Sequence, residues 1–355
     1  MSFDALLTEL STNPTLQGAG TIYVEQGNYA GGESSIDFNS YNLSNISNSA
    51  LTIQGGWNLT TGSVTSTSNF TVPIIIGSSA NPWGGSLTID SIIIDNSNDT
   101  GLTVYSQSDI TVSNVQSTNS VNGSGAELDA GGNVTIRNST FDRNEVKGAN
   151  IKAGGNVAIS NSSFSITGTN RRQLNGADIV SGGSVSLFDV IANGNREVGV
   201  NITANGRVSI GASFIGGSSF SDMKSMTNTT CPGNGVPFCG YGLMVTTPDS
   251  IDLQGVVGNN NFLWGANLNA GQDVNIVDSI FNANSTEVPT FIDDTGVFIT
   301  AGGNVSLNNV TANDNRLYGA SIDAVGNINI NNSRFLSNNG ETVSGAGVTS
   351  FHGMG

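Results

Sequence analysis

The sequence repeats itself from Gly101 onward, with a period of about 23 residues. One copy, GAELDAGGNVTIRNSTFDRN, begins at Gly125, and another, GVFITAGGNVSLNNVTANDN, begins at Gly296. A fixed period in this range is typical of a solenoid, in which each repeat forms one coil and stacks on the next. The 355 residues are therefore expected to grow along one axis and can form a single domain.

Apolar and polar residues alternate inside each repeat, which is the pattern of β-strands with one buried face. In the copy that begins at Gly148, Ala149, Ile151 and Ala153 alternate with polar residues, and the alternation resumes at Val157 after a Gly-Gly turn. Equivalent Val, Ile and Leu positions recur in the other copies, so stacked coils would bury continuous apolar columns. We predict an all-β solenoid with two or three short strands in each coil.

Two columns of amide-bearing residues accompany this pattern. Asn and Asp tolerate left-handed turns, and stacked amides can hydrogen-bond along the axis of a solenoid. The first column occupies the fourteenth position of the repeat: Asn114, Asn138, Asn161, Asp189, Asp278, Asn309 and Asn332. The second lies a few residues later: Asn144, Asn195, Asn261, Asn284, Asn315 and Asn338.

The organisation along the chain is expected to have three parts. Residues 1–17 form an N-terminal cap with a short helix from Ser2 to Leu10, which Pro14 ends. Residues 18–100 form irregular first rungs, and residues 101–355 form the regular repeats. Extra residues always enter at the same point of the repeat, so the insertions should emerge at one corner, around 165–175, 217–241 and 285–295.

The charge balance excludes several partners. The net charge is −16 and only 11% of residues are charged, so the chain repels phosphate backbones and nucleic acid is not expected. No run of about 18 apolar residues occurs, so membrane insertion is not expected either. We predict no cofactor; Ca²⁺ is the one alternative left open, because an acidic surface attracts cations.

Both cysteines lie in one turn-rich stretch, CPGNGVPFC, from Cys231 to Cys239. A disulfide between them would suit an oxidising, extracytoplasmic compartment, and two free thiols are the alternative. The start at Met1 and the end at Gly355, inside a new repeat, indicate a fragment of a longer exported protein. The expected location is extracellular or on the cell surface.

The opening rung, GTIYVEQGNY from Gly20 to Tyr29, is similar to the first rung of proteins in the pectin-lyase-like superfamily. The repeated AGGNV units resemble those of bacterial surface adhesins of the filamentous-haemagglutinin type. The resemblance implies a single-domain right-handed parallel β-helix. It does not fix a function, because this fold includes lyases, hydrolases, adhesins and inert stalks.

Catalytic residues are hard to find in this sequence. The only histidine, His352, lies near the end of the chain, and no metal site is apparent. Asp293 and Asp294 are weak candidates, because glycoside hydrolysis needs two carboxyl groups. One further set falls at matching outward positions on neighbouring coils and reads as a solvated face: Glu127, Asp129, Lys152 and Asp178.

Five residues are candidates for ligand binding. Arg171 and Arg172 form a basic pair inside an insertion. Tyr241, Trp264 and Tyr318 each directly precede the first glycine of a repeat, so they should form one aromatic column. Such a column could stack on sugars or simply fill a hydrophobic corner.

The leading interpretation is non-enzymatic: a β-helical segment of a bacterial surface protein, serving as adhesin, stalk or cell-envelope element, with glycans or cell-surface molecules as partners. The absence of an evident acid/base cluster carries it. The first alternative is a polysaccharide-active enzyme, a lyase or hydrolase of the pectin-lyase-like type. The second is a filament subunit that associates end to end through its terminal coils.

Overall fold

The computed structural model describes residues 3–29, 34–166, 173–214, 218–222, 240–285 and 294–338, together with the backbone of 348–351. The chain divides into two compact units, Met1–Ser163 (unit 1) and Phe164–Gly355 (unit 2), and each is described by itself. The predicted insertions fall largely outside the described residues, as do Asp293, the Arg171–Arg172 pair and both cysteines.

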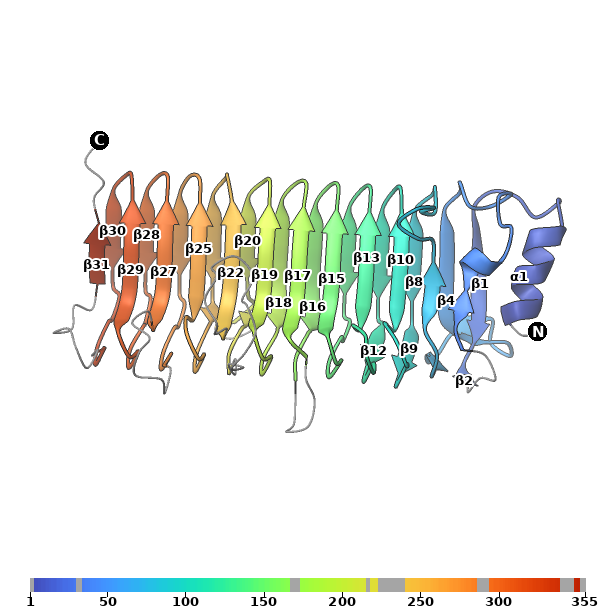
Figure 1. Ribbon diagram of the computed structural model, residues 1–355, viewed down its shortest axis with the longest axis horizontal. Coiled ribbons are helices and arrows are strands. Elements are labelled where there is room, and N and C mark those ends of the chain that lie inside the picture. Colours follow the sequence, from blue (N-terminus) through green and yellow to red (C-terminus); the bar gives the residue numbers. More distant parts are fainter. Residues whose placement is uncertain are drawn as a thin grey trace. The chain divides into compact units, whose positions relative to one another are not determined.

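Helix α1 (Phe3–Thr12) lies at the N-terminal end of unit 1, as Figure 1 shows in dark blue. Its side chain Leu7 is 1% exposed, and the ring of Phe3 meets that of Phe70 edge-on, with centroids 5.7 Å apart. The helix thus covers the apolar end of the first coil, which would otherwise be open to water. The predicted short helix is confirmed, with its C-terminal end two residues later than Leu10.

Unit 1 contains three parallel sheets that wind around one core (Figure 1). The first sheet is β1 (Gly20–Glu25), β4 (Leu51–Asn58), β8 (Leu87–Asp90), β11 (Ile110–Ser113), β14 (Val134–Arg137) and β16 (Val157–Ser163). The second sheet is β3 (Ile36–Asp37), β7 (Ile74–Ile76), β10 (Leu102–Ser106), β13 (Ala126–Ala130) and β15 (Lys147–Ala153). The third sheet is β2 (Gly27–Tyr29), β6 (Ser68–Phe70), β9 (Ile92–Asp95) and β12 (Gln116–Thr118). A short antiparallel strand, β5 (Ser63–Val64), pairs with β4, and a 3₁₀ turn, η1 (Phe38–Ser40), follows β3.

Unit 2 repeats this arrangement with longer strands in its second sheet. Its first sheet is β18 (Val185–Ile191), β20 (Val208–Gly211), β23 (Ile251–Gln254), β26 (Val274–Val277), β28 (Val305–Asn308) and β30 (Ile328–Asn331). Its second sheet is β17 (Asn175–Ser181), β19 (Val198–Ala204), β22 (Tyr241–Thr247), β25 (Ala266–Ala270), β27 (Thr295–Ala301), β29 (Tyr318–Ala324) and β31 (Val348–Phe351). Two short strands, β21 (Ser218–Ser219) and β24 (Val256–Val257), pair with each other in parallel after the strands of the first sheet.

The core of each unit consists of apolar columns in strict register. In unit 1, Val134 pairs with Val157 and Ile136 with Ile159, and all four are at most 2% exposed. Each inward residue rests on its equivalent in the next coil, so the alternation seen in the sequence becomes a continuous buried stack. The predicted all-β parallel β-helix is confirmed.

The two columns of Asn and Asp residues have different structural roles. The seven residues of the fourteenth position all have φ between 49° and 56°, the left-handed region that Asn and Asp tolerate better than other side chains. The later column is buried and forms an amide ladder: Asn261 Nδ2 donates to Asn284 Oδ1 at 3.0 Å, and Asn284 Nδ2 donates to Asn315 Oδ1 at 2.9 Å. One column therefore turns the chain and the other stabilises the stack of coils along its interior.

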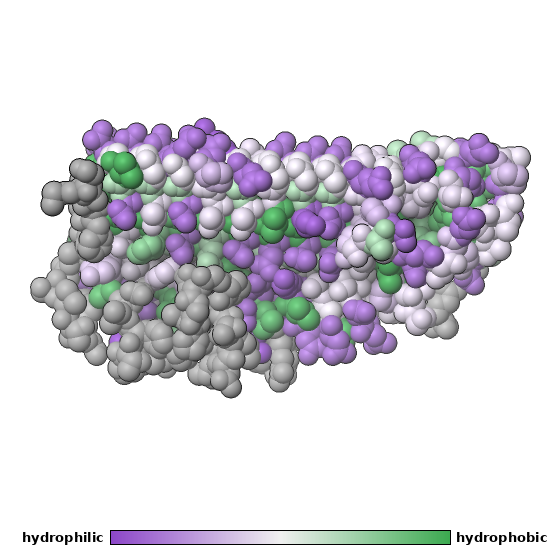
Figure 2. Space-filling model, turned by 45° about the horizontal axis from the view of Figure 1, so that its top comes forward, coloured by the Kyte–Doolittle hydropathy of each residue, from purple (hydrophilic) through white to green (hydrophobic). Residues whose placement is uncertain are grey.

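Hydrophilic residues cover much of the described surface on the face drawn in Figure 2, and hydrophobic side chains appear between them as separate small patches. Large exposed hydrophobic residues are accordingly scattered along the chain; Phe188 is 45% exposed and Val325 is 84% exposed. None of the helices in the described segments has the length and apolar character that crossing a membrane requires.

Candidate functional site

Four ionisable side chains meet on the outward face of the second sheet of unit 1. They come from three consecutive strands: Tyr105 from β10, Glu127 and Asp129 from β13, and Lys152 from β15. The strand register places Tyr105 beside Asp129 and Asp129 beside Lys152. We call these four residues the outward cluster. Such a gathering is notable in a chain that is only 11% charged.

Tyr105 and Glu127 are joined across two coils. The phenol of Tyr105 donates a hydrogen bond to Oε1 of Glu127 at 3.0 Å. Partial burial, this hydrogen bond and the negative charges of Glu127 and Asp129 raise the pKa of Tyr105 to about 12. The phenol is therefore protonated at neutral pH, and it can donate a proton but not accept one.

Asp129 and Lys152 form an ion pair at the same level. Nζ of Lys152 lies 3.2 Å from Oδ2 of Asp129, with the side chains 66% and 32% exposed respectively. A pair this exposed contributes little to stability, on the order of 0–1 kcal/mol. Its ammonium group stays accessible to an anionic ligand, and Asp129 keeps that ammonium beside the carboxylates.

Glycine turns hold the three strands of the cluster in register. The amide of Gly131 donates to the carbonyl of Ser106 at 2.8 Å, and the amide of Gly154 donates to the carbonyl of Ala130 at 2.8 Å. A side chain at Gly154 would begin 2.3 Å from the carbonyl oxygen of Gly131, so the coils approach too closely there for any other residue. The AGG segments of the repeat thus fix the positions of the side chains just before them.

Sequence reasoning found three members of the outward cluster and missed the fourth. Glu127, Asp129 and Lys152 were expected at roughly matching outward positions. The strand register pairs Asp129 with Lys152, whereas Glu127 pairs with Asn150. Asp178, expected with them, lies in unit 2 and accepts a hydrogen bond from Nδ2 of Asn175 at 2.9 Å. Tyr105 was missed, although the repeat alignment that pairs Gly101 with Gly125 puts it directly against Asp129.

The catalytic candidate Asp294 is almost completely buried. Its side chain is 1% exposed, and its Oδ2 lies 3.3 Å from Nη1 of Arg316, whose side chain is 18% exposed. A carboxylate in this position is anchored below the surface at the start of β27. Its neighbour Asp293 falls outside the described residues, so the pair expected from the sequence is not seen together.

The predicted aromatic column in unit 2 is only partly accessible. Tyr241 is 2% exposed and contacts Trp264, with ring centroids 5.1 Å apart. Trp264 is half-buried and stacks on Phe298 at 5.1 Å with an interplanar angle of 11°. Tyr318 pairs in register with Thr295 on β27. These contacts give Tyr241 the environment of a core residue. Trp264 and Phe298 are only half-buried, so both side chains remain partly accessible to solvent.

The described residues contain no group of three or more His, Cys, Asp and Glu side chains close enough to hold a metal ion. In the outward cluster, two carboxylates share their face with an ammonium group and a phenol. Calcium sites usually take six to eight oxygen ligands, so Glu127 and Asp129 alone do not make one. Ca²⁺ binding stays a prediction.

Comparisons with known proteins bear on the fold. No protein-family profile and no curated protein matches the sequence. The A-module of the mannuronan C-5 epimerase AlgE4 from Azotobacter vinelandii is similar in structure, at 14% identity and a TM-score of 0.56, over 98% of this chain and 95% of that chain. The A-module of AlgE6 from the same organism is 14% identical over 95% and 92% of the two chains, with a TM-score of 0.36, too low to indicate a common fold.

At this identity the likeness to AlgE4 shows the fold alone, and it confirms the predicted parallel β-helix. It also corrects the leading interpretation of the sequence. We expected a non-enzymatic adhesin or stalk, but a solved structure that matches 98% of this chain is a module of a mannuronan C-5 epimerase. The expectation was wrong because it took a chain without internal histidine for an inert one, whereas Tyr, Glu, Asp and Lys suffice for proton transfer.

Proposed function

We propose that this chain is a polysaccharide-active enzyme and that its substrate lies across the outward face of β10, β13 and β15. One observation carries the proposal: the Tyr105–Glu127 and Asp129–Lys152 pairs bring a proton donor, two carboxylates and a cation together on three neighbouring strands. The proposal takes up the alternative that the sequence left open, an enzyme rather than an adhesin.

The reaction that uses all four side chains is proton abstraction from the sugar carbon next to a carboxylate, in a polymer that contains uronate units. Lys152 would hold the substrate carboxylate and stabilise the charge that develops on it. Glu127 or Asp129 would accept the carbon-bound proton. Tyr105, protonated at neutral pH, would give its proton to the leaving glycosidic oxygen in an elimination. Return of a proton to the opposite face of the carbon would instead invert that carbon.

The likeness to an epimerase that acts on mannuronan supports this reaction class, because such an enzyme inverts a carbon of a uronate polymer. Glycoside hydrolysis is a second candidate that one observation favours. Glu127 and Asp129 are two positions apart on β13, which separates their backbones by roughly 7 Å. Pairs of catalytic carboxyls in glycoside hydrolases are about 5–10 Å apart.

A polysaccharide substrate also suits the extracellular location expected from the sequence, since such polymers lie outside the cell membrane. Glycans are then the partners of the outward cluster. End-to-end association of the chain stays a separate prediction.

The test is an assay of the whole chain against uronate and neutral polysaccharides, with and without Ca²⁺. Cleavage that leaves unsaturated non-reducing ends indicates elimination, and cleavage that leaves saturated non-reducing ends indicates hydrolysis. Uptake of solvent deuterium without cleavage indicates inversion. We expect Glu127→Gln and Asp129→Asn to lower the rate by at least about a hundredfold, as loss of a general base typically does.

Arg207→Gln is the matched control, because Arg207 forms an exposed ion pair with Asp252 in unit 2, and its removal should leave the rate unchanged. No turnover of any polymer by the folded wild-type chain would refute the proposal. Turnover that Glu127→Gln and Asp129→Asn leave intact would place the reaction elsewhere and refute it equally.

A further inference from the structure

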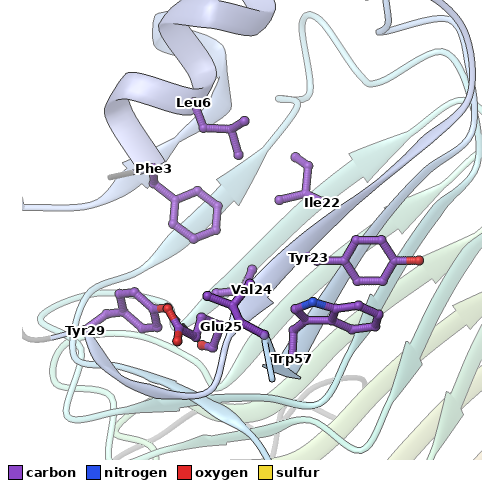
Figure 3. Close-up of a pocket in the computed structure, with 9 residues that line it drawn as sticks. Phe3, Leu6, Ile22, Tyr23, Val24, Glu25, Tyr29 and Trp57 are labelled. Carbon is purple, nitrogen blue, oxygen red and sulfur yellow. Dashed lines mark hydrogen bonds between the residues drawn. The ribbon is translucent and has the colours of Figure 1, made fainter. Parts of the chain in front are cut away.

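A cavity of about 340 Å³ opens at the N-terminal end of unit 1. Its walls come from α1, β1, β2 and β4, and Figure 3 shows the side chains around it. It lies at β1, the end strand of the first sheet, whereas the outward cluster lies on the second sheet. The volume is at the small end of the range for ligand pockets, about 300–1,000 Å³.

Two aromatic rings form one side of this N-terminal pocket. Tyr23 on β1 and Trp57 on β4 lie next to each other on the right side of Figure 3. Their ring centroids are 4.1 Å apart, with an interplanar angle of 39°. Tyr23 is 54% exposed, and nearby Leu59 is 71% exposed. Tyrosine and tryptophan that stay this accessible offer apolar ring faces to a ligand together with polar tips.

The opposite side of the pocket carries polar groups. Tyr29 stacks on Phe70 at 5.0 Å and donates its hydroxyl proton to the backbone carbonyl of Glu25 at 2.8 Å, which leaves the phenol oxygen able to accept. Within the described residues the carboxylate of Glu25 takes part in no ion pair or hydrogen bond. Figure 3 places Glu25 between Tyr29 and Trp57.

The indole nitrogen of Trp57 differs from that of the buried Trp83. Nε1 of Trp83 donates to the carbonyl of Ser49 at 2.8 Å, and the side chain is 4% exposed. Nε1 of Trp57 makes no hydrogen bond to another described residue, and the side chain is half-buried at the pocket. Trp83 is thus a core residue whose indole N–H is hydrogen-bonded within the chain. The indole N–H of Trp57 can donate to a ligand in the pocket.

We propose that the N-terminal pocket is a second, non-catalytic glycan site that takes one uncharged pyranose unit. The C–H faces of the sugar would lie on Tyr23 and Trp57, and its hydroxyl groups would donate to the Glu25 carboxylate and accept from the Trp57 indole. Glu25 is the only charged residue among the described ones that line the pocket, so a uronate would meet a like charge there and be excluded. The inference does not rest on the function proposed for the outward cluster.

The test measures binding of a cello-oligosaccharide and of an oligogalacturonate of equal length, by calorimetry and by tryptophan fluorescence. We expect only the uncharged probe to bind. Trp57→Ala and Tyr23→Ala should each weaken that binding about tenfold, because each aromatic contact contributes about 0.5–1.5 kcal/mol beyond the area it buries. Trp57→Phe keeps a ring but removes the N–H donor and should weaken binding by a smaller factor. Glu25→Gln should lower the discrimination against the oligogalacturonate.

Phe188→Ala is the matched control, because Phe188 is an exposed aromatic residue of unit 2 that lies outside this pocket. Binding of the uncharged probe that survives Trp57→Ala, equal binding of the two probes, or no binding at all would each overturn the proposal. Self-association that Trp57→Ala abolishes, without any binding of the sugar, would show an interface between chains instead. Because binding is read without turnover, failure here leaves the test of the outward cluster unaffected.

Discussion

The phenol of Tyr105 is bound to the carboxylate of Glu127 on the next coil, with 3.0 Å between the two oxygens. Asp129 is the register partner of Tyr105 on that coil, so two negative charges face one hydroxyl group. Burial favours the protonated phenol most, and both carboxylates add to this effect, so the pKa of Tyr105 is raised. The stability of the folded state should therefore depend on pH in the range where Tyr105 loses its proton.

Tyr105→Phe should change how stability depends on pH above pH 10. The pKa of Tyr105 is raised from 10.0 to about 12 on folding, so the folded state favours the protonated phenol. That contribution is complete below pH 10 and is lost as the pH rises through 12. The thermal unfolding midpoint of the wild type should exceed that of Tyr105→Phe by a constant amount below pH 10. The gap should close between pH 10 and 12.

A gap that stayed constant up to pH 12 would contradict the raised pKa. In the activity assay, Tyr105→Phe should abolish elimination but should spare the exchange of the carbon-bound proton with solvent, since the carboxylates remain. Loss of both reactions together with an unchanged midpoint would give Tyr105 the role of base instead.

Removal of the Lys152 charge should affect function and not stability. Lys152→Met breaks an exposed pair with Asp129, which should cost less than about 1 kcal/mol of unfolding free energy. If the ammonium holds the substrate carboxylate, Michaelis constants for uronate polymers should rise at least about tenfold while those for neutral polymers stay the same. Arg207→Gln, which breaks another exposed pair, controls for a general charge effect. An equal change for both classes of polymer would remove Lys152 from substrate binding.

Much of the fold could be predicted from the sequence because the repeat imposes local geometry at each coil. The alternation around Ile151 fixes which face is buried, and the left-handed Asn138, with φ of 50°, marks the corner. The first coils, expected only as irregular rungs, are harder to predict, and Trp83, which is 4% exposed, is an example. Its burial depends on a hydrogen bond to Ser49, 34 residues away, which no local pattern reveals.

The candidate site could be predicted only in part. Glu127, Asp129 and Lys152 follow from the register, yet their chemistry depends on which side chain each one meets on the next coil. Tyr105 illustrates this point, because its hydrogen bond runs diagonally to Glu127 and not to its register partner Asp129. Side-chain contacts between coils belong to the tertiary structure, and the repeat period and the composition do not determine them.

Gly154→Ala should destabilise the chain because of a backbone contact. A Cβ at this position would lie 2.3 Å from the carbonyl oxygen of Gly131, so two coils must move apart. Overpacking of this kind typically costs about 1–3 kcal/mol, and the midpoint should fall accordingly. Gly20→Ala is the control, since a Cβ there meets nothing within 4 Å and the midpoint should stay unchanged or rise slightly. Equal midpoints for the two variants would show that the turn relaxes without cost.

The variant Asp294→Ala should show whether the carboxylate of Asp294 has a structural or a catalytic role. Its side chain is 1% exposed and pairs with Arg316 at 3.3 Å, so Asp294→Ala would remove a carboxylate from beside a largely buried cation. Breaking a buried pair from one side costs about 3–5 kcal/mol, which should lower the thermal midpoint by several degrees. Asp323→Asn, on an exposed position of β29, should leave the midpoint almost unchanged. If Asp294 is structural, turnover of Asp294→Ala measured well below its own midpoint should equal that of the wild type. Lost turnover with an unchanged midpoint would give Asp294 the catalytic role that the sequence suggested and would move the reaction away from the outward cluster.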